Sequence, residues 1–204
     1  MSINHDTKPQ DFMQEYMTGL NSIIAALPGD DIQTMISYLT EAYEQDKMIF
    51  VAGNGGSAAT ASHMACDLSK TVLGNRRNDH TKRFAVIALT DNVPLITAWA
   101  NDADYNLIFA EQLRNLASEG DLLILISGSG NSPNLLEAAK TAREMGVRSF
   151  GLLGFDGGAV KELLDHVLIV ASNHYGHIED IHMILTHLIT AYYKELLNLL
   201  SEKV

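Results

Sequence analysis

His63 and Asp67 are the first two side chains in the sequence that could do chemistry together. They stand four residues apart in a segment that predicts a helix, so both side chains project from the same helix face. An imidazole and a carboxylate one turn apart can exchange a proton or bind a divalent metal ion together. Pairs at this spacing are also common as solvated ion pairs, and these two residues alone leave both interpretations open.

A glycine-rich turn precedes the pair. Residues 47–51 form an apolar run rich in branched and aromatic side chains, which predicts a buried strand. Glycines at 53, 55 and 56 then allow the backbone to turn tightly and to approach a ligand closely. Ser57 is expected to cap the helix that follows. The strand, the turn and the start of the helix together direct several N–H groups to one spot, which favours binding of an anion or a sugar hydroxyl. The alternative is a turn with a structural role only.

A second loop of the same kind lies at residues 127–132, with the sequence Ser-Gly-Ser-Gly-Asn-Ser. It follows the predicted strand 121–126 directly and precedes Pro133 and a predicted helix that runs to residue 145. Hydroxyls and backbone N–H groups at a helix N-terminus form a neutral cradle for a phosphate. The loop has neither the lysine of a Walker motif nor the spacing of a dinucleotide fingerprint. Because it joins a buried strand abruptly, a ligand loop is favoured over a flexible linker.

The last predicted helix, residues 178–200, carries Glu179, His182 and His187 among mostly apolar residues. Glu179 and His187 are two turns apart, about 12 Å along the axis, so spacing alone does not bring them to one atom. Considered singly, His182 and His187 are predicted to be buried, hydrogen-bonded structural histidines. A helix that is apolar nearly all round must be buried on several sides, which indicates contact with another subunit.

The elements that must position these residues alternate between helix and strand, which predicts an α/β fold. Further strands are expected at 84–89, 149–153 and 166–170, and further helices at 93–100, 105–117 and 160–164. Two helices precede the first strand. The first of them, over 11–27, has an apolar stripe that must pack either against another subunit or against the flank of its own domain. The polar stretch 75–83 is predicted to be a mobile loop. We expect a single domain, with a helical segment 1–45 used in oligomer packing and a sheet-and-helix core at 46–204.

Composition excludes several classes of protein. The formal net charge of −11 argues against nucleic acid as a direct partner, although it allows a small anionic ligand held by N–H groups. The single cysteine, Cys66, rules out an internal disulfide and is expected to lie beside the core as a small apolar residue. The N-terminus lacks the pattern of a signal peptide, and no apolar run reaches the ~18 residues of a membrane span. These features predict a cytoplasmic protein without a membrane partner.

The two ligand loops, His63 and the histidine-bearing terminal helix occur in the order found in the sugar isomerase (SIS) domain family. Within it the chain resembles the phosphoheptose isomerases over almost its whole length. The resemblance implies a three-layer α/β sandwich with a five-stranded parallel sheet flanked by helices, plus N-terminal helices. It also implies a homotetramer, such as a dimer of dimers, with active sites at subunit boundaries. The implied reaction converts the ketose sedoheptulose 7-phosphate to the aldose D-glycero-D-manno-heptose 7-phosphate, with zinc as the common metal.

Carried over by position, the resemblance implies three sets of site residues. The metal ligands would be His63, Asp67, Glu179 and His187, and the acid–base residues Asp67, Glu179 and His187. The substrate would contact Asn54, Gly55, Gly56, Ser57, Asn101, Asp102, Ser127, Gly128, Ser129 and Ser132.

Four positions depart from the family pattern. Asp67 stands where the family has glutamate, Glu179 where it has glutamine, and the loop at 127–132 has glycine where a threonine is common. Lys70 and Thr71 occupy the region of a missing arginine. Two neutral imidazoles and two carboxylates would balance a divalent cation, so we expect bound zinc, with manganese or iron as alternatives.

The expected mechanism is proton transfer between adjacent carbons through an enediolate, with Asp67 or Glu179 as the base and His187 as a second acid–base group. Two other classes of function stay open from the sequence. One is a non-catalytic SIS adaptor that binds a replication-initiator protein, and the other is a sugar-phosphate sensor without turnover. A further alternative is an isomerase for another heptose or octose phosphate.

Overall fold

The computed structural model describes residues 8–74 and 82–201, and side chains up to residue 199. Most of the predicted loop at 75–83 lies outside the described residues. No described helix combines the length and hydropathy needed to cross a membrane.

Five parallel strands form one sheet in the order β2-β1-β3-β4-β5. All five predicted strands are present, with bounds that differ from the predicted ones by at most two residues. They are β1 (Met48–Gly53), β2 (Ala85–Ala88), β3 (Leu122–Ser127), β4 (Arg148–Gly154) and β5 (His166–Val170).

Seven α-helices surround or extend from the sheet within the described residues. They are α1 (Pro9–Ala25), α2 (Gly29–Glu44), α3 (Gly56–Ser69), α4 (Val93–Asp102), α5 (Ala110–Leu116), α6 (Pro133–Glu144) and α7 (Tyr175–Ser201). Short 3-10 turns lie at Thr71–Leu73, Tyr105–Leu107 and Ala159–Leu163. The helix predicted at 105–117 is therefore wrong as one element, because Asp104 accepts a hydrogen bond from the N–H of Asn106 and starts a separate turn.

The sheet lies between two helical layers, which confirms the predicted three-layer α/β fold. Buried side chains of α2, α3 and α7 pack with Ile49, Val51 and Ile124 on one face. Those of α5 and α6 pack with Phe50, Ala52 and Leu125 on the other face. Successive residues of a strand point to opposite faces, so the continuous apolar runs of β1 and β3 fit a sheet buried on both sides.

The chain order of the strands places a switch point between β1 and β3, the position at which open α/β sheets bind ligands, and we call this position the crevice. These strands pair directly, from Ile49↔Leu122 to Gly53↔Ile126. The chain leaves β1 into α3 on one face and leaves β3 into α6 on the other. Loops that diverge in this way at the carboxyl ends of neighbouring strands leave a crevice where ligands bind in open α/β sheets. Both loops singled out in the sequence begin at this crevice.

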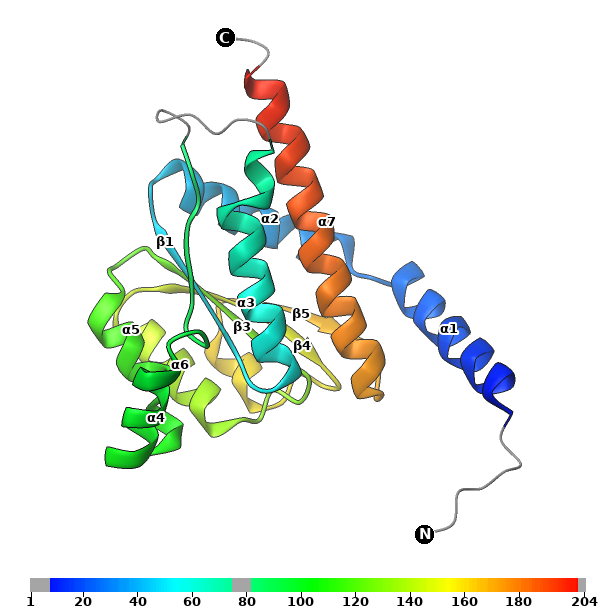
Figure 1. Cartoon of the computed structure of the whole chain (residues 1–204), viewed down its shortest axis with the longest axis horizontal. Helices are drawn as coiled ribbons and strands as arrows, with labels where there is room; N and C mark the ends of the chain where they lie inside the picture. The colour runs from blue at the N-terminus through cyan, green and yellow to red at the C-terminus, as the bar shows by residue number, and fades with distance from the viewer. Residues whose placement is uncertain (1–7, 75–81, 202–204) are drawn as a thin grey trace.

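Helices α3 and α7 lie side by side on one face and run in the same direction, with both N-terminal ends near the carboxyl ends of the strands (Figure 1). The buried residues of α7 follow one side of the helix, including Ile181, Leu185 and Ile189. Leu188 and Tyr192 on another side are each 42% exposed. The expected burial of α7 on several sides is thus not met within one chain.

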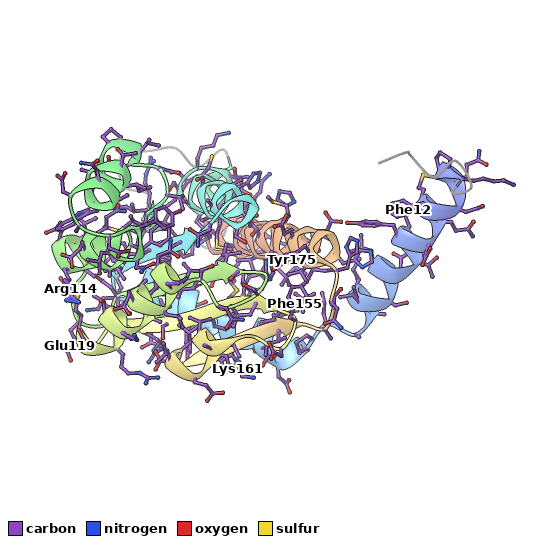
Figure 2. All side chains as sticks on the ribbon, turned by 90° about the horizontal axis from the view of Figure 1, so that it is seen from below. Phe12, Arg114, Glu119, Phe155, Lys161 and Tyr175 are labelled. Carbon is purple, nitrogen blue, oxygen red and sulfur yellow. The ribbon has the colours of Figure 1, made fainter. Side chains whose placement is uncertain are left out.

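Helix α1 projects away from the rest of the molecule (Figures 1 and 2). None of its side chains is buried, and Phe12, Met13 and Met17 are each more than half exposed. It contacts the N-terminal part of α7 through Tyr16, whose hydroxyl donates a hydrogen bond of 2.6 Å to Asp180. This hydrogen bond is the main cause that raises the pKa of Tyr16 to about 12.

Cys66 is exposed, so its expected place beside the core is wrong. It lies on the side of α3 next to β2, the edge strand at which the sheet ends. Cys66 lines a groove of about 870 Å³ together with Ser62, Ile87 and Leu95.

Candidate functional site

The turn after β1, residues 54–57, holds Asn54 at the crevice. Gly55 is the N-cap of α3 and has a φ of +56°, which favours glycine. Its carbonyl accepts hydrogen bonds from the N–H groups of Ala58 and Ala59. Ser57 was expected to cap the helix, but it is buried inside the first turn and makes no side-chain cap. The helix starts before it because the glycines supply the change of direction by themselves.

The serine loop, residues 127–132, is closed by its own hydrogen bonds. The N–H of Gly130 donates to the Ser127 hydroxyl at 3.0 Å, and the carbonyl of Gly130 accepts from the N–H of Val160 at 2.9 Å. Gly130 has a φ of +64°, and a Cβ there would lie 2.6 Å from the carbonyl carbon of Gly157. The loop therefore rests backbone against backbone on the turn after β4. Ser132 then stands as the N-cap of α6.

A pair of amides joins the two loops. The side chains of Asn54 and Asn134 exchange two hydrogen bonds, each 2.9 Å long. Asn134 is 1% exposed and lies in the first turn of α6, directly after the serine loop. The hydroxyl of Tyr105 donates a third hydrogen bond, of 3.3 Å, to Oδ1 of Asn54. The two predicted ligand loops are thus parts of one site.

The first turns of α7 approach both loops. The ring of Tyr175 occupies the space beside Gly128, where a Cβ would lie 2.7 Å from Cε1 of the ring. Phe155 supports this ring, with a centroid distance of 4.8 Å, and Figure 2 shows the two aromatics next to each other. One turn further on, the carboxylate of Glu179 lies beside Gly56, with Oε2 2.8 Å from the position of an added Cβ. Glu179 therefore lies next to the N-terminus of α3.

His63, Asp67 and His187 form a second group, the His–Asp–His cluster, between α3 and α7. Nε2 of His63 lies 3.0 Å from Nε2 of His187 and 3.3 Å from Oδ2 of Asp67. Asp67 is 8% exposed; the hydroxyl of Thr71 donates to its Oδ1 at 2.8 Å, and that of Thr190 lies 3.3 Å from its Oδ2. One ligand atom from each cluster member lies within 4.8 Å of the others, a geometry suited to a metal ion.

The structure does not bring Glu179 into this cluster. Among the described residues, only the three cluster members satisfy that distance criterion. Because α3 and α7 run in parallel, Glu179 lies beside Gly56 and His187 beside His63, so the two pairs are separated by about 12 Å along α7.

The two histidines of α7 have different environments. His182 is 1% exposed and its Nε2 lies 3.3 Å from the carbonyl oxygen of Leu153, which confirms the predicted structural role. Burial lowers the pKa of His182 to about 4, so the ring is neutral at pH 7. His187 is exposed and faces His63, so its prediction as a buried structural histidine is wrong. The position of each histidine on α7 determines its exposure, because His182 faces the sheet and His187 faces α3.

Asn101 and Asp102 end α4 and are exposed. The side-chain amide of Asn101 donates a 2.7 Å hydrogen bond to Asp102. The same segment continues to Tyr105, whose hydroxyl reaches Asn54. Among the described residues, the pair makes no direct hydrogen bond to either ligand loop.

Comparison with known proteins decides the family. The SIS domain family matches residues 12–154 of the chain. The chain belongs to the SIS domain family. Phosphoheptose isomerase from Aliarcobacter butzleri is 42% identical to this SIS protein over 149 residues, 73% of this chain and 76% of the relative. The phosphoheptose isomerase from Nitratiruptor sp. is 40% identical over 149 residues, 73% of this chain and 77% of the relative.

A solved structure gives the same result for the fold. Phosphoheptose isomerase from Neisseria gonorrhoeae superposes on this SIS protein with a TM-score of 0.83, at 27% sequence identity, over 92% of this chain and 100% of the other. The predicted family and its phosphoheptose isomerase branch are confirmed.

Three residues of the site were missed by the sequence argument: Tyr105, Asn134 and Tyr175. Asn134 stands two residues after the serine loop, and Tyr175 stands one turn before Glu179. These spacings could have indicated both residues. Nothing local indicates Tyr105, because its contact with Asn54 depends on the packing of α4 and the turn after it.

Proposed function

We propose that this SIS protein interconverts the ketose and aldose forms of a heptose phosphate, with sedoheptulose 7-phosphate and D-glycero-D-manno-heptose 7-phosphate as the favoured pair. The reaction would move a proton between adjacent carbons through an enediolate. One observation carries the proposal. Asn54 of the glycine turn is hydrogen-bonded to Asn134, directly after the serine loop, at the crevice from which α3 and α7 run to the His–Asp–His cluster. The similarity to phosphoheptose isomerases supports the choice of substrate.

The serine loop is the proposed phosphate site. Ser127, Ser129 and Ser132 offer hydroxyls, and the start of α6 adds the positive end of a helix dipole. No lysine or arginine is needed for such a site, which agrees with the acidic net charge of the chain. Binding the phosphate here would orient the reacting carbons at the other end of the sugar. The oxygens nearer the reacting carbons would contact the turn at 54–57.

The His–Asp–His cluster fits a divalent metal ion by its chemistry as well as by its distances. Two imidazole nitrogens and a carboxylate oxygen are the usual donors for zinc, and three protein ligands leave one position open. The hydroxyls of Thr71 and Thr190 would orient the Asp67 carboxylate as outer partners. Zinc held there would polarise the sugar carbonyl and stabilise negative charge on its oxygen.

Glu179 is the carboxylate we assign to proton removal, rather than Asp67. Asp67 is nearly buried and contacts two hydroxyls and His63, whereas Glu179 is exposed beside Gly56 in the turn that would contact the sugar. Glu179 and His187 are about 12 Å apart along α7, so their side chains must lean toward each other for the base and the metal to act on adjacent carbons. His187 then holds the metal and has no separate acid–base role.

The chain is also proposed to self-associate through its exposed apolar surface. The exposed Phe12, Met13 and Met17 of α1 and the exposed side of α7 would be covered in a homotetramer, such as a dimer of dimers. A cytoplasmic location fits a phosphorylated sugar substrate and a single free cysteine. Light scattering after size exclusion should give four chains per particle, and a monomer would contradict this part of the proposal.

The decisive experiment is incubation with sedoheptulose 7-phosphate in heavy water. Enediolate chemistry should place deuterium at C2 of the aldose product, and no exchange with intact binding would instead favour a sensor. Glu179→Gln should lower kcat by about 10²–10⁴-fold, the usual loss for a general base. This variant restores the glutamine that the family resemblance implies, so a fully active Glu179→Gln protein would return the base role to Asp67. Asp67→Asn should lose the metal as well as activity.

A further inference from the structure

We propose that Asn134 and Tyr105 are positioning residues that fix the side-chain amide of Asn54, so that Asn54 presents an N–H donor to one of the two oxygens of the enediolate, the other being the oxygen that zinc would hold. The inference rests on the proposed function and adds to it the direction of the hydrogen bond between Asn54 and the substrate. Asn54 would give a hydrogen bond to the substrate rather than accept one from a sugar hydroxyl.

Counting the hydrogen-bonding groups of Asn54 leads to this assignment. A side-chain amide has two N–H donors and one oxygen with two lone pairs. Oδ1 of Asn54 accepts from Asn134 at 2.9 Å and from Tyr105 at 3.3 Å, so both lone pairs are used. One N–H donates to Oδ1 of Asn134 at 2.9 Å. The second N–H is the group that Asn54 still has to offer a ligand at the crevice.

Asn134 is suited to hold the amide in place. It is 1% exposed and belongs to the first turn of α6, so its backbone cannot move independently of the serine loop. The hydrogen bonds between the two amides are partly buried, and on the fully buried side of Asn134 an unpaired amide group would cost stability. A shift of Asn54 relative to the phosphate site is therefore resisted by the same pair of bonds.

Tyr105 determines which end of the amide faces the ligand. If both amides of the Asn54–Asn134 pair were reversed, the two mutual hydrogen bonds would survive, so the pair alone does not select an orientation. The phenol hydroxyl breaks this symmetry, because the aromatic ring makes it a stronger donor than acceptor. Its bond to Oδ1 fixes the oxygen of Asn54 on the side of Tyr105 and the second N–H on the opposite side.

The chemical consequence is a fixed donor at the site of charge development. An N–H held in position before the reaction stabilises an oxyanion without reorganising, and removing one such donor costs about 10²–10³ in kcat. A freely rotating amide would lose part of this effect.

Asn54→Asp tests the direction of the hydrogen bond. Aspartate has nearly the same shape and can still accept from Asn134 and Tyr105, but a negative oxygen replaces the NH2 group, so both the outward N–H and the hydrogen bond donated to Oδ1 of Asn134 are lost. We expect kcat to fall by about 10²–10³-fold, with a KM within a few-fold of the wild type because the serine loop is unchanged. If Asn54 accepted a hydrogen bond from the sugar, Asp would do so at least as well. A kcat within threefold of the wild type would therefore overturn the proposal.

Variants of the two positioning residues test how the direction is set. Asn134→Leu keeps the volume but removes both hydrogen bonds, and kcat should fall by about 10²-fold through misplacement of Asn54. Asn134→Asp still accepts from the N–H of Asn54 and should recover part of that loss. Tyr105→Phe removes one hydrogen bond and should lower kcat by about 2–10-fold. Asn115→Leu and Tyr38→Phe are matched controls outside the site and should leave kcat unchanged.

A readout without turnover separates this inference from the proposed function. The side-chain amide signal of Asn54 in a ¹⁵N spectrum is assigned by its loss in Asn54→Asp. In the wild type the two protons should be well separated and slow to exchange, and in Asn134→Leu they should converge and exchange faster. A wild type that shows this pattern but turns over no sugar would contradict only the proposed function. An Asn134→Leu variant with wild-type kcat and an unchanged amide signal would overturn the inference.

Discussion

Gly130→Ala tests whether the serine loop is held in place by backbone packing against the turn after β4. Two separate costs arise in the structure. Alanine at a φ of +64° costs about 1–2 kcal/mol relative to glycine. The added Cβ would also lie 2.6 Å from the carbonyl carbon of Gly157 and 3.1 Å from the backbone nitrogen of Gly158, so backbone atoms must move. Overpacking of this kind costs about 1–3 kcal/mol more.

The total loss for Gly130→Ala is therefore about 2–5 kcal/mol in the free energy of unfolding. For a chain of this length, 1 kcal/mol lowers Tm by about 2–4 °C, so the expected decrease in Tm is about 4–20 °C. Differential scanning calorimetry measures it directly. The affinity for inorganic phosphate should fall as well, because the loop that is displaced is the proposed phosphate site.

Gly55→Ala is the matched control for the steric part. Gly55 has a similar φ of +56°, but a Cβ there would meet no described atom within 4 Å. We expect a loss of about 1–2 kcal/mol, or a decrease in Tm of about 2–8 °C. If Gly130→Ala and Gly55→Ala had the same Tm, the backbone contact between the serine loop and the 157–158 turn would carry no stability, and the reasoning would be refuted.

Three further outcomes are expected. Zinc at 100 times its Kd should stabilise the wild type by about 2.7 kcal/mol but not Asp67→Asn; calorimetry that finds equal gains would exclude the His–Asp–His cluster as the site. Burial lowers the pKa of His182 from 6.5 to about 4, so as the pH falls through this range the histidine is protonated in the unfolded chain before it is protonated in the folded one. The free energy of unfolding, measured with urea, should therefore fall by about 3 kcal/mol between pH 6.5 and pH 4. The pKa of Tyr16, raised from 10.0 to about 12 chiefly by the hydrogen bond to Asp180, implies a stabilising contact that is present below pH 10 and lost as the pH rises to 12. Ultraviolet titration should show a late phenolate step that Tyr16→Phe removes.

Local pattern was enough to predict most of the fold. The five strands are continuous apolar runs, and each begins and ends near glycine or polar residues, so period and composition located them to within two residues. The failures lie where a single hydrogen bond or the end of a layer decides the structure. Asp104 interrupts the helix predicted at 105–117, and Cys66 faces the open edge beside β2, which no sequence period reveals.

The site was predictable as two loops and a set of acid–base residues, but not as a geometry. His63 and Asp67 share one helix, so their proximity follows from spacing. The approach of His187 to His63 depends on the parallel packing of α3 and α7, which the chain order alone does not fix. The same packing separates Glu179 from the cluster, although the family resemblance grouped all four residues as ligands. The metal ligands and the identity of the base stay predictions, which Asp67→Asn and Glu179→Gln test.

The position of Cys66 makes the outer groove uniquely addressable. It is the single cysteine of the chain, it is exposed, and it lines the groove beside the edge strand β2. A maleimide dye would therefore attach one fluorophore per chain, without any engineered residue. Its labelling rate at high and low protein concentration would report whether neighbouring subunits shield that side of the molecule.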